Sequence, residues 1–344
     1  MVKNKGAALI TVLMIVFIIM AIITNITVSN YRTIRLLSNQ KIEAQASLIL
    51  IAATAFGRAG LGTSASTSKI DTLNDIWAQP LPKSNVFDNI FMSGYIIDEQ
   101  SKFNVNDLVQ NGVIDKNILK KLAKLFEYLN IPTSMASAIA SYITAPQYQD
   151  DIMMSYTTGS PAYRPAGRPL IDLSELILVK NMQADWVYKL NQYLTAIPQN
   201  VNYQNESSAK NSNNHDNEHN HDELNDDTKV NNHELHININ TASAEVIAAK
   251  SGIPLDIAQR IVNTRNATAF KNNGEITKFL NNNGIILTGT SINKIDVDVL
   301  DTTSQYFTIH AIIDSDDYQF KLISLVFRQN RSGQWPQILW QHPE

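Results

Sequence analysis

The chain opens with MVKNKGAALITVLMIVFIIMAIIT (residues 1–24), a short polar leader followed by a long apolar run. The run begins at Ala7, and up to Ile23 only Thr11 interrupts it. Continued to Val28, the segment would form about 33 Å of helix at roughly 1.5 Å per residue, which matches the roughly 30 Å hydrocarbon core of a bilayer. The sequence therefore predicts a leader over residues 1–6 and a transmembrane helix over residues 7–28.

The charges around this segment leave its orientation open. Two lysines precede the span within residues 3–5, and three basic residues follow it within residues 32–41, so the positive-inside rule does not decide. A secretory signal peptide is one alternative, but its apolar core is usually about 7–15 residues long and ends at a small-residue cleavage site. A plain signal anchor is another, although it does not explain the glycine at the polar-to-apolar junction.

The junction sequence KGAALI (residues 5–10) resembles the leader of type IV prepilins, which a membrane peptidase cuts after the glycine. This resemblance implies cleavage between Gly6 and Ala7, where glycine offers a flexible, unbranched scissile bond. In most prepilins the fifth mature residue is a glutamate that pairs with the terminal amine of a neighbouring subunit, whereas this chain has Thr11. Because an unpaired carboxylate costs several kcal/mol in a membrane, Thr11 favours a subunit at a filament tip.

Residues 29–56 show the apolar spacing of an amphipathic helix. Its apolar positions are Ile34, Leu37, Ile42, Ala46, Ile49, Ala53 and Phe56. We therefore expect one helix to run from the membrane into a soluble head and to end at Gly57, Gly60 and Gly62. The prolines between residues 63 and 93 predict a loop with few strands.

The next segments predict a strand, a polar turn and helices. Residues 94–98 predict the strand, and residues 103–106 a second short one that enters a helix. Four polar residues there are expected to act in turns and caps rather than in catalysis: Asp98, Glu99, Asn104 and Asn106. Helical spacing then continues to residue 142, with a turn at Ile131-Pro132.

Two stretches of the chain are similar to each other. NVN (residues 104–106) aligns with NIN (residues 238–240), and Ile131-Pro132 aligns with Ile253-Pro254. A later short helix follows in both, over 173–179 and 274–280. Since repeated helical units usually stack to bury a shared core, we expect a helical domain made of two similar bundles.

Residues 199–236 lie between these two stretches and are rich in Asn, Asp, Glu and His. Such a composition cannot bury enough apolar surface to fold alone, so it predicts a low-complexity linker. Metal binding by its histidines is the alternative. These histidines are His215, His219, His221, His233 and His236.

After Leu287 the apolar residues alternate. Residues 295–299, 306–313, 320–328 and 338–340 are predicted as antiparallel strands. Because the amphipathic helix at the other end of the chain needs a sheet to pack on, we expect a head that is split in sequence. The predicted class is α+β.

The predicted domains are, beyond the leader and the span, a pilin-like head over 29–103, a first helical bundle over 104–198, the linker over 199–236, a second bundle over 237–286 and head strands over 287–344.

Composition excludes several kinds of protein. The chain has 344 residues, a net charge of −4 and no cysteine, so it has no disulfide framework and no cysteine nucleophile. Its 28 basic residues form no block, which argues against nucleic-acid binding. It has no phosphate loop, nucleophile elbow or zinc-protease motif, so we expect no enzyme.

These features together, with the stretch GYIIDEQ (residues 94–100), resemble the protein K family of type II secretion systems. The resemblance implies a large minor pseudopilin at the tip of a periplasmic pseudopilus that helps to export folded proteins across the outer membrane. It implies minor pseudopilins I and J (and H) and the prepilin peptidase as partners. It also implies a single pass through the bacterial inner membrane, with most of the chain in the periplasm.

Members of that family bind calcium in the head, and Asp150 and Asp151 are the candidate ligands here. Two adjacent aspartates in a solvated loop are the alternative.

Two other functions remain open at this point. Residues 238–265 resemble a helix-hairpin-helix DNA-binding module of competence proteins, although Pro254 removes a backbone donor where such hairpins have a second glycine. A minor pilin of a type IV pilus would share the leader and the fold, but its usual head is smaller.

Overall fold

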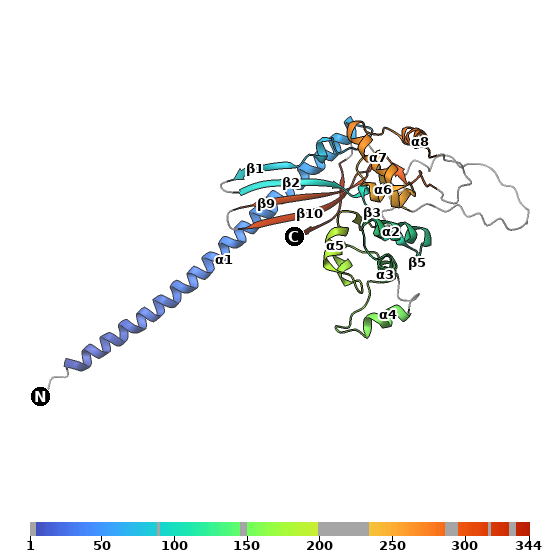
Figure 1. Ribbon diagram of the computed structural model, residues 1–344. Helices are drawn as coiled ribbons and strands as arrows, with labels where there is room; N and C mark the ends of the chain where they lie inside the picture. Colours follow the sequence, from blue (N-terminus) through green and yellow to red (C-terminus); the bar gives the residue numbers. More distant parts are fainter. Residues whose placement is uncertain are drawn as a thin grey trace, which may run out of the picture.

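The structure, a computed structural model, describes residues 5–87, 90–144, 150–198, 234–285, 295–315, 318–329 and 335–344. One long helix projects from a head in which an antiparallel sheet lies beside a group of shorter helices (Figure 1). The amino terminus lies at the far end of the projecting helix, and the carboxyl terminus lies in the head (Figure 1). The predicted α+β class is confirmed.

Helix α1 runs over Lys5–Thr67. The predicted stop at Gly57, Gly60 and Gly62 is wrong, because all three glycines lie inside this helix. Packing explains the difference at Gly57, where a Cβ would lie 3.0 Å from Cγ2 of Ile309. The missing side chain lets α1 approach the sheet closely, and this contact outweighs the roughly 1 kcal/mol helix penalty of a glycine.

The head contains a five-stranded sheet of order β1-β2-β9-β10-β11 in which every neighbouring pair is antiparallel. Its strands are β1 Leu81–Phe87, β2 Ile90–Asp98, β9 Tyr306–Asp314, β10 Gln319–Phe327 and β11 Gln337–Pro343. A 3-10 helix, η1 (Ile76–Ala78), precedes β1.

Strands β9, β10 and β11 confirm the strands predicted after residue 306. Strand β1 contradicts the loop predicted between residues 63 and 93. Pro82 is tolerated in β1 because β1 is an edge strand, where a missing N–H need not interrupt a hydrogen-bond ladder.

The carboxyl-terminal part of α1 packs on one face of this sheet. The buried residues of α1 there are Ala46, Leu50, Ala53 and Leu61. They pack against alternate residues of β9, namely Phe307, Ile309, Ala311 and Ile313. Of the predicted apolar positions, Ala46 and Ala53 are buried and Ile49 packs on the cluster, whereas Ile34, Leu37 and Phe56 are exposed. The apolar spacing therefore identified only part of the helix face that covers the sheet.

The sheet takes its strands from two distant parts of the chain. Strand β2 pairs with β9 from Phe91 opposite Asp314 to Asp98 opposite Phe307. The described helices from α2 to α8 come between these two strands in the sequence. The prediction of a split head with an inserted helical domain is confirmed.

The helical domain consists of two similar parts, which we call the first copy (residues 103–195) and the second copy (residues 237–301). Before and within the first copy lie η2 Glu99–Ser101, β3 Phe103–Asn104, η3 Val105–Leu108, β4 Val109–Gln110, β5 Val113–Ile114, α2 Lys116–Tyr128, α3 Ser134–Ile143, α4 Asp150–Thr157, η5 Leu173–Leu178, α5 Ala184–Leu190 and β6 Leu194–Thr195. The second copy holds β7 Ile237–Asn238, α6 Ala244–Ser251, α7 Leu255–Ala267, α8 Asn273–Asn282 and β8 Leu300–Asp301. A short parallel strand pair closes each copy, β3 with β6 and β7 with β8.

One prediction fails at the end of the second copy. Residues 295–299 are not strands of the terminal sheet. Instead, Val299 is buried in the core of the helical domain, and Ile295 and Val297 pack against that core. Their alternation reflects an irregular segment that buries every second side chain against helices, which a strand pattern also does.

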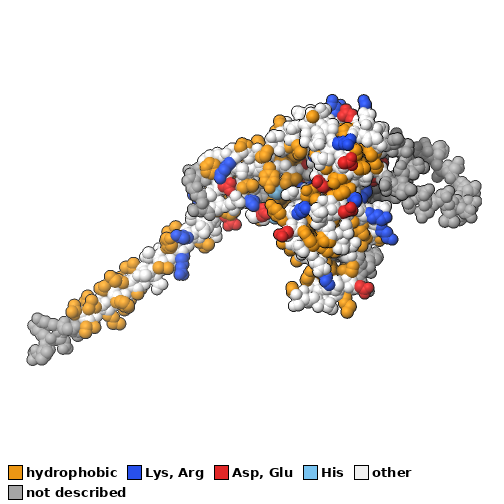
Figure 2. All heavy atoms as spheres, in the orientation of Figure 1, with side chains coloured by type: hydrophobic (Ala, Val, Ile, Leu, Met, Phe, Trp, Pro, Cys, Tyr) orange, Lys and Arg blue, Asp and Glu red, His pale blue; other side chains and the backbone are white. Residues whose placement is uncertain are grey.

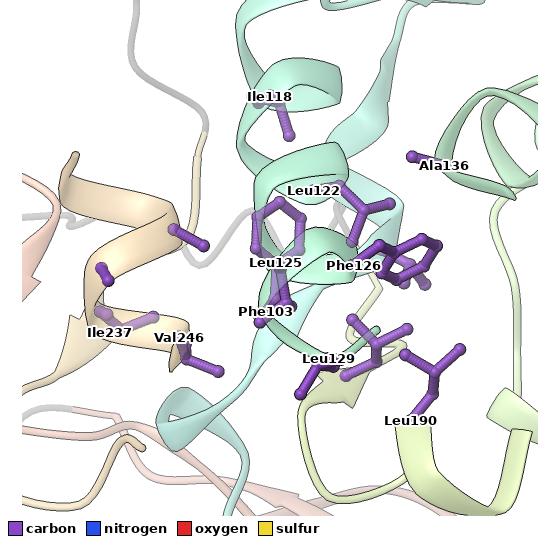
Figure 3. Packing of buried hydrophobic residues seen from close by; sticks show 14 of the residues in the cluster. Phe103, Ile118, Leu122, Leu125, Phe126, Leu129, Ala136, Leu190, Ile237 and Val246 are labelled. Carbon is purple, nitrogen blue, oxygen red and sulfur yellow. The ribbon is translucent and has the colours of Figure 1, made fainter. Parts of the chain in front are cut away.

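The two copies share one hydrophobic core. Figure 3 shows Leu122, Leu125 and Phe126 of α2 lying between Val246 of the second copy and Leu190 of the first. The prediction that two similar bundles stack is confirmed. Of the predicted linker, residues 199–233 lie outside the described residues. Glu234 is described and is buried.

Candidate functional site

The amino-terminal part of α1 leaves the head and carries apolar side chains along its length (Figure 2). Its large apolar residues between Leu9 and Val28 are 42–74% exposed. The most apolar window of α1 has a mean hydropathy of 2.8, and none of that window is buried. Within the described residues, α1 is the one helix long and apolar enough to cross a membrane.

Polar residues in this span are few, and two of its threonines bond within the helix. The hydroxyl of Thr24 donates to the carbonyl of Met20, and that of Thr27 donates to the carbonyl of Ile23, each at 2.8 Å. A polar group that is bonded inside its own helix costs little in hydrocarbon. This part of α1 is therefore suited to a lipid environment or to a bundle of apolar helices.

The predicted processing residues lie at the start of this helix. Gly6 and Ala7 belong to the first turns of α1, which begins at Lys5. Thr11 lies one turn farther along and is exposed. Cleavage between Gly6 and Ala7, and the role of Thr11, stay predictions.

Each copy of the helical domain is held by one asparagine that binds a distant backbone segment at two points. In the first copy, Asn106 accepts from the N–H of Leu170 at 2.7 Å and donates to its carbonyl at 3.0 Å. In the second copy, Asn240 makes the same two bonds with Phe270, both at 2.9 Å. The sequence alignment found these asparagines but not their function.

Similar capping follows in both copies. Glu175 accepts from the N–H of Ile171 at 2.8 Å, and Glu275 accepts from the N–H of Lys271 at 2.9 Å. Each therefore closes the turn that leads into a short helix, η5 or α8. The two copies are similar in their hydrogen bonds as well as in their helices.

A buried polar cluster joins the second copy to the sheet of the head. Asp98, at the end of β2, accepts from the hydroxyls of Thr241 and Ser304, both at 2.6 Å. Asn238 donates to Ser304 at 2.9 Å and to the carbonyl of Asp71 at 3.1 Å. All of these residues are buried. We call Asp71, Asp98, Asn238, Thr241, Ser304 and Arg328 the junction cluster.

Arg328 compensates the charge of this cluster. Its guanidinium lies 2.6 Å from Oδ2 of Asp71, donates to the carbonyl of Ser304 at 2.6 Å, and lies over the ring of Phe307 at 4.7 Å. Since Arg328 follows β10 and Asp71 follows α1, this ion pair connects two distant parts of the split head, and Asn238 of the second copy bonds to the carbonyl of Asp71 beside it. Nothing in the sequence pattern indicated this pair.

Burial raises the pKa of Asp98 to about 6, against the hydrogen bonds from Ser304 and Thr241, which lower it. The nearby carboxylate of Asp71 raises it further. The predicted turn residues Asp98 and Asn104 do cap turns, since Asp98 accepts from the N–H of Gln100 and Asn104 from that of Asn106.

A second buried ionic cluster lies between the copies. Lys250 is fully buried, with its ammonium 3.2 Å from Glu234 and 3.8 Å from Asp107. Lys121 of α2 lies 2.7 Å from the other oxygen of Glu234. Burial raises the pKa of Asp107 to about 6, although Lys250 opposes this shift. The cluster ties Glu234, the first described residue after residue 198, to both copies.

The hairpin that resembles a DNA-binding module has three basic residues, of which Arg260 is exposed and the other two are buried. Lys250 is 0% exposed, and Arg265 is 8% exposed and donates to backbone carbonyls, including that of Ile239. Pro254 precedes α7 and has no N–H to offer a phosphate. These features argue against phosphate binding by this hairpin.

The predicted calcium ligands lie at the start of α4. Asp150 and Asp151 form its first turn, and Asp151 is exposed. Within the part of the chain that the structure describes, no three His, Asp or Glu side chains gather as a metal site. Of the histidines in the predicted linker, only His236 is a described residue. Calcium binding stays a prediction.

Comparison with known proteins gave matches over most of the chain. Residues 101–199 and residues 237–298 match two family models, each described as type II secretion system (T2SS), protein K. Type II secretion system protein K of Pseudomonas aeruginosa is 25% identical over 291 residues, 80% of this chain and 77% of that protein.

A solved structure has the same fold. It is a chain in the crystal structure of the GspK-GspI-GspJ complex from the type 2 secretion system of enterotoxigenic Escherichia coli. The TM-score is 0.63 at 18% identity, over 89% of this chain and 98% of that one.

Proposed function

The chain belongs to the protein K family of type II secretion systems, and on this premise we propose that it is the minor pseudopilin that caps a periplasmic pseudopilus. The observation that carries the proposal is a single helix, α1, whose first part is an exposed apolar span and whose second part packs on a pilin-like sheet. The inserted helical domain enlarges the head, which supports a position at the tip of the filament. A tip position is consistent with Thr11, which requires no neighbouring amine.

We propose that minor pseudopilins equivalent to I and J are its partners, because the structure with the same fold is a chain of a GspK-GspI-GspJ complex. Pseudopilin H is proposed as a further partner on the family resemblance alone. The part of α1 that crosses the head keeps large apolar residues exposed. They are Leu48, Ile51 and Phe56, at 54–69% exposure. This row is suited to pack against a partner's helix.

The role we propose is structural rather than enzymatic. The leader is removed between Gly6 and Ala7 by the prepilin peptidase, α1 is extracted from the inner membrane, and the head stays in the periplasm. Growth of the filament below the tip then pushes folded cargo outward through the outer membrane. Calcium at Asp150 and Asp151 would add stability to the first copy, and its binding is open to direct titration.

Mass spectrometry of the mature protein tests the processing step. We expect an amino terminus at Ala7 in the wild type and an uncleaved chain in Gly6→Val. Asn4→Ala, inside the leader but away from the junction, is the matched control and should still be cut. A wild-type chain that starts at Met1, or at any residue other than Ala7, contradicts the proposal.

Co-purification with I and J tests the assembly step. Leu48→Asp places a charge in the exposed row of α1 and should reduce recovery of both partners about tenfold or more. Tyr188→Asp, the same kind of change at a 78% exposed residue of the first copy, should leave recovery unchanged. Equal recovery with Leu48→Asp and wild type would remove this face of α1 from the interface.

DNA binding is the rival function. If the hairpin of the second copy bound DNA, the purified chain would bind duplex DNA with a steep dependence on salt. We expect no such binding, because Lys250 and Arg265 are buried.

A further inference from the structure

A small basic cluster lies just beyond the apolar span of α1. Counting about 1.5 Å per residue from Val28, Arg32 lies about 6 Å and Arg35 about 10 Å farther along the helix. The polar zone of a bilayer extends roughly 5–7 Å beyond the hydrocarbon core on each side. With their long side chains, both guanidinium groups reach the depth of the lipid phosphates when residues 7–28 span the core.

The cluster occupies one side of the helix. At about 100° per residue, Tyr31, Arg35 and Arg32 fall within roughly a third of the helix circumference. The guanidinium of Arg35 lies over the ring of Tyr31 at 4.9 Å, and all three side chains are exposed. A tyrosine at this depth is typical of the aromatic belt of membrane proteins. We call Tyr31, Arg32 and Arg35 the basic collar.

The collar has no carboxylate to neutralise it. The first acidic residue of the whole sequence is Glu43, about 16 Å beyond Arg32 along the helix. Among the ion pairs of the described residues, neither arginine has an acidic partner. A second copy of this helix at the same depth would bring further arginines and no acid. Any carboxylate or phosphate that pairs with these charges at this depth would therefore come from another molecule.

We propose that the basic collar binds the phosphate of an anionic phospholipid, in the leaflet on the side of the head. The planar fork of arginine matches phosphate with two parallel hydrogen bonds, and two arginines on one side of a helix can hold one headgroup. The inference rests on the membrane span of the proposed function and not on the secretion role. Such a contact holds the mature subunit at a fixed depth until it is extracted.

Native mass spectrometry of the full chain in detergent, with phosphatidylglycerol or phosphatidylcholine added, tests the proposal. We expect the wild type to retain phosphatidylglycerol in preference to phosphatidylcholine. Each arginine should contribute about fivefold to the preference for phosphatidylglycerol. The double variant Arg32→Gln, Arg35→Gln should therefore lower this preference about 25-fold. Lys41→Gln removes one charge about 20 Å beyond Val28, outside the headgroup depth, and should keep the preference.

Three results would overturn the proposal. The first is an unchanged lipid preference in the double arginine variant. If that variant also loses its partner subunits, the arginines bind a protein and not a lipid. The second is an equal loss in Lys41→Gln, which would indicate attraction by net charge alone. The third is displacement by glycerol phosphate at the same concentration as the lipid, which would indicate a site for a free anion. Failure of leader cleavage or of co-purification with I and J leaves these measurements interpretable, so the two proposals fail separately.

Discussion

The two copies of the helical domain start with the same asparagine pair but direct the first asparagine to different partners. In the first copy, the amide of Asn104 donates to Asp107 at 2.7 Å, inside the same copy. In the second copy, the amide of Asn238 donates to Ser304 and to the backbone of Asp71, in the head. Asn104 also binds the backbone N–H of Ile197, just after the first copy, at 3.0 Å, so its contacts lie in and directly after its own copy, whereas those of Asn238 lie in the head.

This difference distinguishes the hydrogen bonds that stabilise the fold of each copy from those that fix where the copy lies in the molecule. The second asparagine, Asn106 or Asn240, makes the same two backbone bonds in both copies, so those bonds belong to the fold of the unit. The first asparagine accepts from the N–H of the second in both copies, but its side-chain N–H groups bond to different partners, so those donated bonds depend on the position of the unit in the chain. The second copy is bonded to the pilin-like head through Asn238 and Thr241, and the end of the first copy also meets the head, since Thr195 and Thr308 of β9 both hydrogen-bond to Glu99.

The largest effect is expected at the head side of the junction cluster. Arg328→Ala removes the cation that faces Asp71, and a buried charge left without its partner costs about 3–5 kcal/mol of unfolding free energy. Denaturant unfolding of the full chain in detergent, followed by tryptophan fluorescence, measures it. Lys321→Ala breaks a solvent-exposed pair between β10 and Glu344, which follows β11, and should cost less than about 1 kcal/mol. If Arg328→Ala and Lys321→Ala lower the unfolding free energy equally, the buried pair of Arg328 with Asp71 adds no more stability than an exposed pair.

A slightly smaller effect is expected from the shared backbone bonds. Asn106→Ala and Asn240→Ala each leave a buried N–H and a buried carbonyl without their side-chain partner, at Leu170 or Phe270. Each change should lower the unfolding free energy by about 2–4 kcal/mol, and by similar amounts in the two copies. The same denaturant titration compares them. A cost under about 0.5 kcal/mol in one copy would show that the copies are not equivalent.

The first asparagine of each pair should have a smaller effect whose location differs. Asn104→Ala and Asn238→Ala should each cost about 1–2 kcal/mol. Hydrogen exchange read by mass spectrometry should show faster exchange around Asp107 for the first variant and around Ser304 and Asp71 for the second. Faster exchange in the head for both variants would contradict the attachment through the second copy.

Local patterns predicted much of this fold. Helices α2 and α3 followed from apolar spacing and the turn at Pro132, and the relation between the copies followed from NVN and NIN. The terminal strands followed from alternation after Tyr306. Each of these features depends on residues close together in the sequence, where spacing alone determines which face is buried.

The features that sequence reasoning missed depend on distant residues. Helix α1 continues past Gly57 because Ile309 packs there, and the junction cluster joins Asp71, Asp98 and Arg328 across more than 200 residues of sequence. The sequence alone does not distinguish a fully buried charged residue from an exposed one. Only its three-dimensional neighbours show that Arg328 is part of the core.

The smallest expected effect is a pH dependence of the unfolding free energy. It comes from two buried carboxylates, Asp98 in the junction cluster and Asp107 in the ionic cluster between the copies. Burial raises the pKa of Asp98 and of Asp107 from 3.8 to about 6 in the folded chain. The folded state therefore binds protons more strongly than the unfolded state. The resulting stabilisation is fully present below about pH 4 and is lost as the pH rises to about 6. The shift corresponds to at most about 3 kcal/mol per residue, and relaxation and water entry reduce this to about 1 kcal/mol.

Asp98→Asn isolates the contribution of the junction cluster. Between pH 4 and pH 7, the unfolding free energy of this variant, measured relative to that of the wild type, should rise by about 1 kcal/mol, because the amide has no proton to lose. Asp185→Asn, which removes an exposed carboxylate at the start of α5, serves as the control. If Asp98→Asn and Asp185→Asn follow the wild type equally, Asp98 keeps one charge state on folding and the junction is held by Arg328 alone. A rise specific to Asp98→Asn would show that attachment of the second copy weakens as Asp98 ionises.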